Sequence, residues 1–172
     1  MKTLIYAFYE LKGTIKNARL HILGGIDDES YYQECLELIR ALKLEDVHLP
    51  GVVNVLEYER LDFTVLSSIS EGQPLSVLES FAARRPCVTT DVGCCRELVE
   101  GTPDDPFGMA GFVVAPMHAE MMAEMEQLCK DKNLRLRMGE NGRNMFRNIM
   151  CTMIYSTIIQ PITRRSSNHG QH

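Results

Sequence analysis

The sequence has 172 residues, of which 45% are hydrophobic, so it is long enough for one domain with a sizeable core. Its formal net charge is −5, and its basic residues form pairs, Arg84-Arg85 and Arg164-Arg165, rather than a stripe, which argues against a nucleic-acid binder. Because no run of about 18 apolar residues occurs, the sequence predicts no membrane-spanning helix.

The first eleven residues carry apolar side chains at helical spacing, at Leu4, Ile5, Phe8 and Leu11. This pattern predicts an amphipathic helix. The apolar run is too short for a signal peptide, and no small-residue cleavage site follows it. We therefore expect the N-terminal segment to be a helix of the fold.

Strand-like and helix-like segments alternate along the rest of the chain. Short apolar runs typical of buried strands occur at residues 18–23, 47–49, 62–66, 86–90 and 111–114. Helical patterns occur at residues 29–42, from Pro74 onward, around residues 117–128 and at 133–146. Strands separated by helices favour right-handed crossovers. We expect an α/β fold, a Rossmann-like parallel sheet with helices on both faces, which binds ligands at the carboxyl ends of its strands.

The C-terminal segment has a different character. Residues 150–162 are apolar with little periodicity, and residues 164–172 are polar. We therefore expect one folded domain over residues 1–147 and a divergent segment over residues 148–172 that ends in a disordered tail. Its apolar part favours self-association.

Six cysteines are present without the paired spacing of metal ligands. The only close pair, Cys94-Cys95, is adjacent in sequence, which disfavours an unstrained disulfide. Free thiols fit a reducing compartment, so the predicted location is cytoplasmic. His48 and His118 have no acidic or serine partner at a recognisable spacing, which leaves a hydrolase triad without support.

The most informative segment is residues 67–82, where a strand is expected to pass through a turn into a helix. Gly72 can take backbone angles closed to other residues, and Pro74 suits the first turn of a helix. The next free backbone amides, those of Leu75, Ser76 and Val77, then face the carboxyl end of the strand with the positive end of the helix dipole. Such a helix end is a ready site for a phosphate.

Two glutamates flank this helix end. Glu71 stands before the turn, and Glu79 lies a turn or more inside the helix, on a different face from Leu78 and Phe81. Carboxylates accept hydrogen bonds from paired hydroxyls, so the layout suits a nucleotide sugar with ribose, diphosphate and hexose in a row. On spacing alone, a helix-terminal acid and a solvated helix glutamate are the more common explanation, and that alternative stays open at this point.

The residues of this region resemble those of a known family. Glu71 through Glu79, with Ala82-Ala83 and residues 86–93, is similar to the E-x7-E region of the family-4 retaining glycosyltransferases, which have the two-domain GT-B fold. Within this family, the sequence is most similar to the PelF-like, pellicle-polysaccharide branch. The similar segments are Ser-Glu-Gly-Gln-Pro-Leu and, after it, Thr-Asp-Val-Gly-Cys-Cys-Arg-Glu-Leu. The likeness begins at Met1, reaches about Phe146, and implies the C-terminal, donor-binding half of that fold.

The resemblance implies a role for each matching residue. Glu71 is the implied catalytic-site residue, which binds hydroxyls of the donor sugar. The other implied donor contacts are the backbone of Gly72, Gln73 and Pro74 at the sugar, the amides of Leu75 and Ser76 at the diphosphate, Glu79 at the ribose, and Val53 in the loop beside the base. The implied activity is transfer of a hexose, with retention, from a nucleoside diphosphate sugar to a glycan. A UDP-hexose is the favoured substrate, and neither a cofactor nor a metal is implied.

Two parts of the family pattern are missing from the sequence. The family's basic pair, which contacts the leaving diphosphate, and the first strand of this domain should precede Met1, and Lys2 is not assigned to that role. The N-terminal domain that binds the glycan acceptor is missing as well. Loss of one such electrostatic donor costs roughly 100- to 1,000-fold in rate, so we expect this chain alone to be inactive. The alternatives are a non-catalytic nucleotide-sugar-binding module, an inactive gene fragment and, more weakly, a sugar-nucleotide epimerase.

Overall fold

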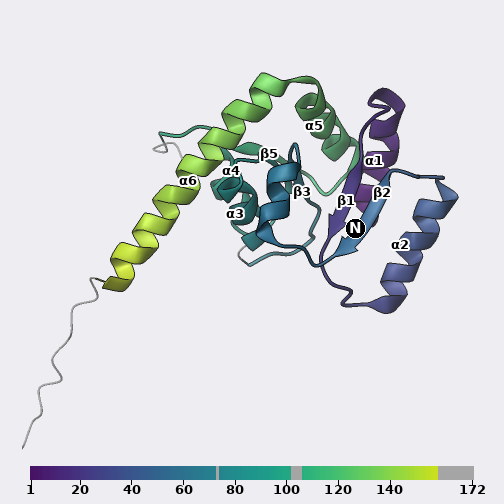
Figure 1. Cartoon of the computed structure of the whole chain (residues 1–172), viewed down its shortest axis with the longest axis horizontal. Helices are drawn as coiled ribbons and strands as arrows, with labels where there is room; N and C mark the ends of the chain where they lie inside the picture. Colours follow the sequence, from purple (N-terminus) through teal and green to yellow (C-terminus); the bar gives the residue numbers. More distant parts are fainter. Residues whose placement is uncertain (73, 102–105, 159–172) are drawn as a thin grey trace, which may run out of the picture.

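The computed structural model describes residues 1–72, 74–101 and 106–158 of the chain (Figure 1). Its helices are α1 (Lys2–Thr14), α2 (Glu29–Ala41), the 3₁₀ helix η1 (Val55–Arg60), α3 (Leu75–Ala82), α4 (Cys95–Glu100), α5 (His118–Lys130) and α6 (Lys132–Ile158). Its strands are β1 (Leu20–Leu23), β2 (Val47–Gly51), β3 (Thr64–Leu66), β4 (Cys87–Thr90) and β5 (Gly111–Val114). The predicted α/β fold, with strands and helices in alternation, is confirmed.

The strands pair in parallel, as predicted, but their backbone pairing divides into two sheets instead of one. β1 pairs with β2, while β3, β4 and β5 form the other sheet in that order. β3 is short, and its whole length from Thr64 to Leu66 is paired with β4. Because the pairing within each sheet is parallel, the loops that follow its strands leave from one edge.

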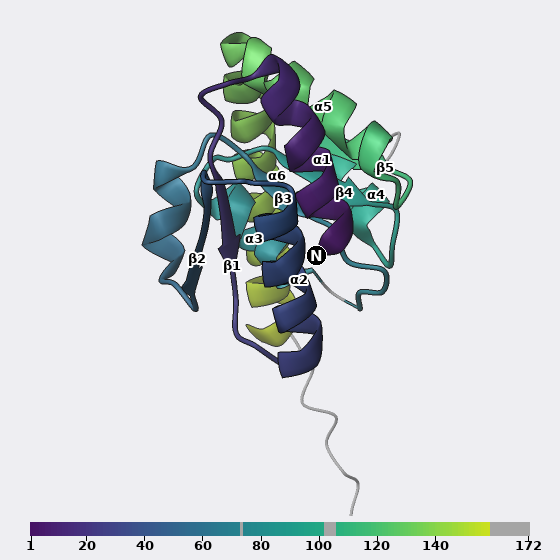
Figure 2. The same cartoon turned by 90° about the vertical axis from the view of Figure 1, so that its right-hand side faces the viewer.

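Helices cover both faces of the three-stranded sheet, which buries the whole of β4. Val88 packs with Phe8 of α1 and Met121 of α5, while the preceding residue, Cys87, packs on the opposite face with Phe81 of α3. This alternation follows from the two-residue period of a strand. On the β1-β2 sheet, α1 and α2 lie side by side over one face (Figure 2). The predicted helices on both faces are therefore confirmed.

The amphipathic helix predicted at the N-terminus is α1, whose residues Leu4, Ile5, Phe8 and Leu11 are buried. Its last turn is tied to the start of β2, because Lys12 donates through Nζ to Asp46 at 2.5 Å. That hydrogen bond lowers the pKa of Asp46 below its ordinary value. Helix α1 is thus part of the folded domain.

Helix α6 is longer than the sequence indicated. A helix was expected over residues 133–146, but α6 continues without a break to Ile158, and its C-terminal end extends past the strands in Figure 1. Apolar periodicity reports which face of a helix is buried, so its loss after residue 147 did not mark a helix end. The boundary between residues 147 and 148 stays a prediction, and the predicted disordered tail lies outside the described residues. None of the helices in the described ranges is long and apolar enough to cross a bilayer.

Helix α3 is anchored to the three-stranded sheet through Ser80, which is fully buried. Its hydroxyl accepts a hydrogen bond from Thr64 of β3 at 2.8 Å and donates to the carbonyl of Arg85 at 2.9 Å. The Ser80 hydroxyl thus both donates and accepts a hydrogen bond, so burying it does not leave an unpaired polar group in the core. This anchor sets the position of α3 and of the glutamate on it.

Candidate functional site

Two loops lie together at the carboxyl edge of the three-stranded sheet, one after β3 and one after β4. The loop after β3 ends at Pro74, and two contacts join it to the end of β4 and to the loop that follows. The Thr90 hydroxyl donates to the carbonyl of Ser68, and the Cys94 thiol donates to the carbonyl of Gly72 at 3.7 Å. The loop that carries Glu71 is therefore held on the end of the neighbouring strand.

Gly93 brings the two loops into direct contact. Its φ angle is +54°, and a Cβ built there would lie 2.3 Å from the carbonyl oxygen of Glu71. Only a residue without a side chain fits at this position, because both the backbone angle and the space exclude one. Gly93 thus determines how closely the Glu71 loop approaches β4.

We expect Gly93→Ala to weaken binding of a nucleotide sugar more than binding of the bare nucleotide, because the clash displaces Glu71. The left-handed backbone adds about 1 kcal/mol of strain. Parallel titrations with the two ligands measure the difference. Gly108→Ala is the matched control, since Gly108 also has a positive φ, of +78°, but lies at the other edge of the sheet, before β5. Equal losses in the two variants would contradict the prediction.

The two glutamates of the E-x7-E segment lie on either side of the start of α3. Glu71 is partly buried in the loop that follows β3. Glu79 is partly buried in the second turn of α3, and its Oε2 accepts a hydrogen bond from the hydroxyl of Tyr58 at 3.0 Å. The predicted placement of both residues around one helix end agrees with the structure, whereas their contacts with a ligand stay predictions.

The first turn of α3 starts where the sequence predicted, but the amide of Val77, expected to be free, is engaged within the helix. Pro74 is buried and precedes the helix, and Val77 donates its amide to the Pro74 carbonyl at 3.0 Å. The amides of Leu75 and Ser76 come before that bond, at the positive end of the helix dipole. Gln73, which was also expected in the site, lies outside the described residues. This end of α3 is suited to a phosphate group.

The loops after β1 and β2 are also neighbours. Gly24 donates its amide to the carbonyl of Gly51 at 3.0 Å, and Val52 beside them is 82% exposed. Val53, predicted to face the base, is partly buried and lies one residue before the cap of η1, Asn54. The loop after β2 therefore leads directly into η1.

Tyr58 of η1 is the site residue that sequence reasoning missed. Burial, and secondly its hydrogen bond to Glu79, raises the pKa of Tyr58 to about 12, so the phenol keeps its proton at neutral pH and acts as the donor. No local motif marks Tyr58, because its partner is 21 positions away in the sequence. It connects the loop after β2 to the glutamate of α3.

A metal ion or a basic side chain could supply positive charge to a diphosphate, and Lys2 is the basic residue considered from the sequence. In the part of the chain that the structure describes, no cluster of three or more histidine, cysteine or acidic side chains could hold a metal ion. Lys2 donates to Glu34 at 2.5 Å, and this hydrogen bond raises the pKa of Lys2. Lys2 is thus engaged by α2, and leaving it out of the site stays a prediction.

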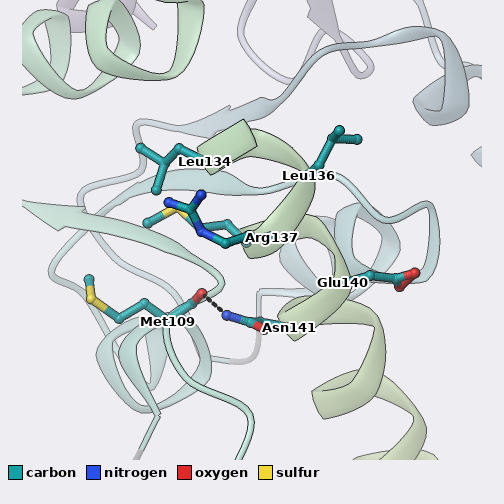
Figure 3. A pocket seen from close by; sticks show the side chains of 7 residues that line it. Met109, Leu134, Leu136, Arg137, Glu140 and Asn141 are labelled. Carbon is teal, nitrogen blue, oxygen red and sulfur yellow. Dashed lines mark hydrogen bonds between the residues drawn. The ribbon is translucent and has the colours of Figure 1, made fainter. Parts of the chain in front are cut away.

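Two surface depressions lie at the opposite edge, near the amino ends of the strands. The first, of about 660 Å³, is lined by Met109, which precedes β5, and by residues of α6; Asn141 there donates to the Met109 carbonyl at 2.8 Å (Figure 3). The second, of about 540 Å³, lies between the end of α1 and residues 42–46 before β2. Parallel sheets bind ligands at the carboxyl edge, so we do not assign the ligand site to either depression.

Comparison with known proteins decides the family. Residues 1–145 match the family model described as glycosyl transferases group 1. The chain belongs to the group 1 glycosyltransferases. Among curated relatives in this family, the putative glycosyltransferase EpsD of Bacillus subtilis is 31% identical over 145 residues, 83% of this chain and 36% of EpsD. The O-antigen biosynthesis glycosyltransferase WbnH of Escherichia coli is 38% identical over 87 residues, 48% of this chain and 23% of WbnH.

Solved glycosyltransferase structures share the fold. The crystal structure of Anabaena HepE in complex with UDP-glucose matches with a TM-score of 0.77 at 17% identity, over 92% of this chain and 44% of HepE. The C-terminal domain of LpcC from Francisella tularensis matches with a TM-score of 0.71 at 20% identity, over 86% of this chain and 77% of that domain. The chain spans less than half the length of the curated relatives described above.

Proposed function

We propose that this chain is the donor-binding half of a retaining hexosyltransferase, which transfers a hexose from a nucleoside diphosphate sugar to a glycan. The observation that carries the proposal is the placement of Glu71 and Glu79 on either side of the first turn of α3. Family membership supports transferase chemistry. The structural similarity to HepE, whose crystal structure contains UDP-glucose, supports a uridine nucleotide as the first ligand to test.

The proposed ligand lies across the start of α3. The amides of Leu75 and Ser76 bind the diphosphate at the positive helix end. Glu79 accepts from the ribose hydroxyls, and Val53 lies beside the base. The hexose lies on the other side, against Glu71 and the backbone of Gly72, Gln73 and Pro74. Each group of the donor then meets a protein group of complementary hydrogen-bonding character.

Retention requires the leaving diphosphate to be stabilised while the hexose is still bound on the same side. The helix dipole of α3 contributes part of that stabilisation, and a basic side chain would contribute more. The basic residue considered from the sequence, Lys2, is paired with Glu34. We therefore propose that turnover needs further residues of the complete enzyme, including those that bind the glycan acceptor, and that the chain alone binds the donor without turning it over.

The pathway and the location follow as further parts of the proposal. The sequence of the E-x7-E region favours membership of the PelF-like branch. Similarity to an O-antigen biosynthesis glycosyltransferase favours a role in polysaccharide biosynthesis. The six cysteines are free thiols in the structure, which fits action in the cytoplasm. The apolar sequence of residues 150–162 favours self-association or contact with another domain.

Calorimetric titration with UDP, UDP-glucose and GDP tests the proposal, and Glu71→Gln makes the test specific for the hexose. We expect the wild-type chain to bind UDP and UDP-glucose more tightly than GDP. The Glu71→Gln chain should bind UDP-glucose about tenfold more weakly, since it loses a hydrogen bond to a charged group, and should bind UDP as the wild type does.

Two outcomes of this titration decide against the proposal or part of it. No binding of any of the nucleotides by the folded wild-type chain would reject the donor-binding function. Equal losses for UDP and UDP-glucose in Glu71→Gln would reject the role of Glu71 as a hexose contact. Glu37→Gln on α2 is the control, because Glu37 is an exposed glutamate on a different helix.

A further inference from the structure

We propose that Tyr58 is a positioning residue for the nucleotide site, which holds the Glu79 carboxylate in the orientation that accepts the ribose hydroxyls. The inference rests on the proposed function, because it requires Glu79 to be the ribose contact. It starts from the hydrogen bond that joins the Tyr58 hydroxyl to Oε2 of Glu79 at 3.0 Å. This bond links η1 to the second turn of α3.

The hydrogen bond leaves most of the accepting capacity of Glu79 unused. A carboxylate offers two oxygens with about four lone-pair directions, and Tyr58 occupies one of them on Oε2. Glu79 is only partly buried, so it is not sealed from a ligand. Two neighbouring ribose hydroxyls can therefore donate to the same carboxylate while Tyr58 remains bound.

The protonation states of the pair suit this arrangement. Since the pKa of Tyr58 is about 12, its hydroxyl is a donor throughout the neutral range. The carboxylate between the phenol and the ribose is then an acceptor on both sides. A phenol that lost its proton would repel Glu79, but that state is reached only far above neutral pH.

Helix η1 presents Tyr58 from a fixed support. Arg85, in the turn between α3 and β4, donates through its guanidinium to the carbonyl of Glu59. At the other end of η1, the side chain of Asn54 accepts from the amide of Leu56 at 3.1 Å and caps the helix. Because η1 is capped at its start and bonded to Arg85 near its end, the Tyr58 hydroxyl has a defined position from which to orient Glu79.

The effect on binding is one of preorganisation. A glutamate side chain has several rotatable bonds, and ordering it on ligand binding reduces affinity. Tyr58 orders the carboxylate before the nucleotide arrives. Without the hydroxyl, Glu79 has to be ordered by the ligand itself, and the affinity for every ligand that contains the ribose decreases.

Tyr58→Phe tests the inference, because it removes the hydroxyl and keeps the ring. We expect this variant to bind UDP and UDP-glucose about fivefold more weakly, and by the same factor, which corresponds to one ordinary hydrogen bond. Calorimetric titration measures both constants, and a thermal melt of the same sample establishes that the variant is folded. Tyr9→Phe is the control, since Tyr9 is an exposed tyrosine on α1.

A double-mutant cycle separates positioning from a purely structural role. If Tyr58 acts through Glu79, then Tyr58→Phe should have no further effect on UDP affinity in a Glu79→Ala background, which removes both accepting oxygens. An equal loss in both backgrounds, or unchanged or tighter binding by the single variant, would overturn the inference and leave the proposed function standing. A folded wild-type chain that binds neither uridine ligand would overturn the proposed function, and the inference with it.

Discussion

Glu79→Gln is expected to weaken binding of UDP and of UDP-glucose together, by roughly 10- to 100-fold, because hydrogen bonds to a charged group contribute about 1.5–3 kcal/mol. The ribose is common to both ligands, so the loss should not depend on the hexose. Glutamine keeps the length of the side chain and one accepting oxygen, but it loses the charge and replaces the other oxygen by a donor. Titration of the variant with each ligand measures the loss.

The comparison with Glu71→Gln makes this prediction specific. A loss shared by both ligands at position 79 and confined to UDP-glucose at position 71 would place the ribose and the hexose on opposite sides of the α3 terminus. Unchanged affinity of the Glu79→Gln variant for both ligands would remove Glu79 from the site. In that case the Tyr58 hydrogen bond would be only a structural link between η1 and α3.

The sequence predicted those parts of the candidate site that depend on residues close together in the chain. Residues 62–82 contain in succession the pattern of a buried strand, a glycine, a proline and an apolar helix. Each of these features predicts a local backbone conformation. The structure accordingly has β3, a loop, and α3 starting at Leu75, although β3 is only partly buried where a buried strand was predicted. Glu71 and Glu79 could be placed around the helix end because the predicted start of the helix near Pro74 fixes how many residues separate each glutamate from it.

The parts that were not predicted depend on contacts between distant segments. Tyr58 reaches Glu79 across 21 positions, and Gly93 faces the Glu71 carbonyl across 22 positions, so neither contact follows from a local pattern. Helices α4 and η1 have six residues each, too few for an apolar period to be visible. The division of the strands into two sheets likewise depends on backbone pairing, which side-chain patterns do not encode.

Gly139→Ala is expected to destabilise the fold by about 2–3 kcal/mol, because it forces apart two elements that pack backbone to backbone. A Cβ at Gly139 of α6 would lie 2.2 Å from the carbonyl oxygen of Arg84, in the turn that ends α3. A carbonyl within a tight turn cannot move aside as a flexible side chain would. The melting temperature should fall by about 4–12 °C for a domain of this size.

Gly13→Ala is the matched control, and it should change stability in the opposite direction. Gly13 also lies in a helix, α1, but nothing lies within 4 Å of the position of its Cβ. Alanine there gains helix propensity, about 0.5–1 kcal/mol, without a clash. If both variants were equally stable, close contact between α6 and the Arg84 turn would not be what positions α3. The placement of Glu79 would then depend on the other contacts of α3, among them the Ser80 anchor to β3 and the packing of Phe81 in the core.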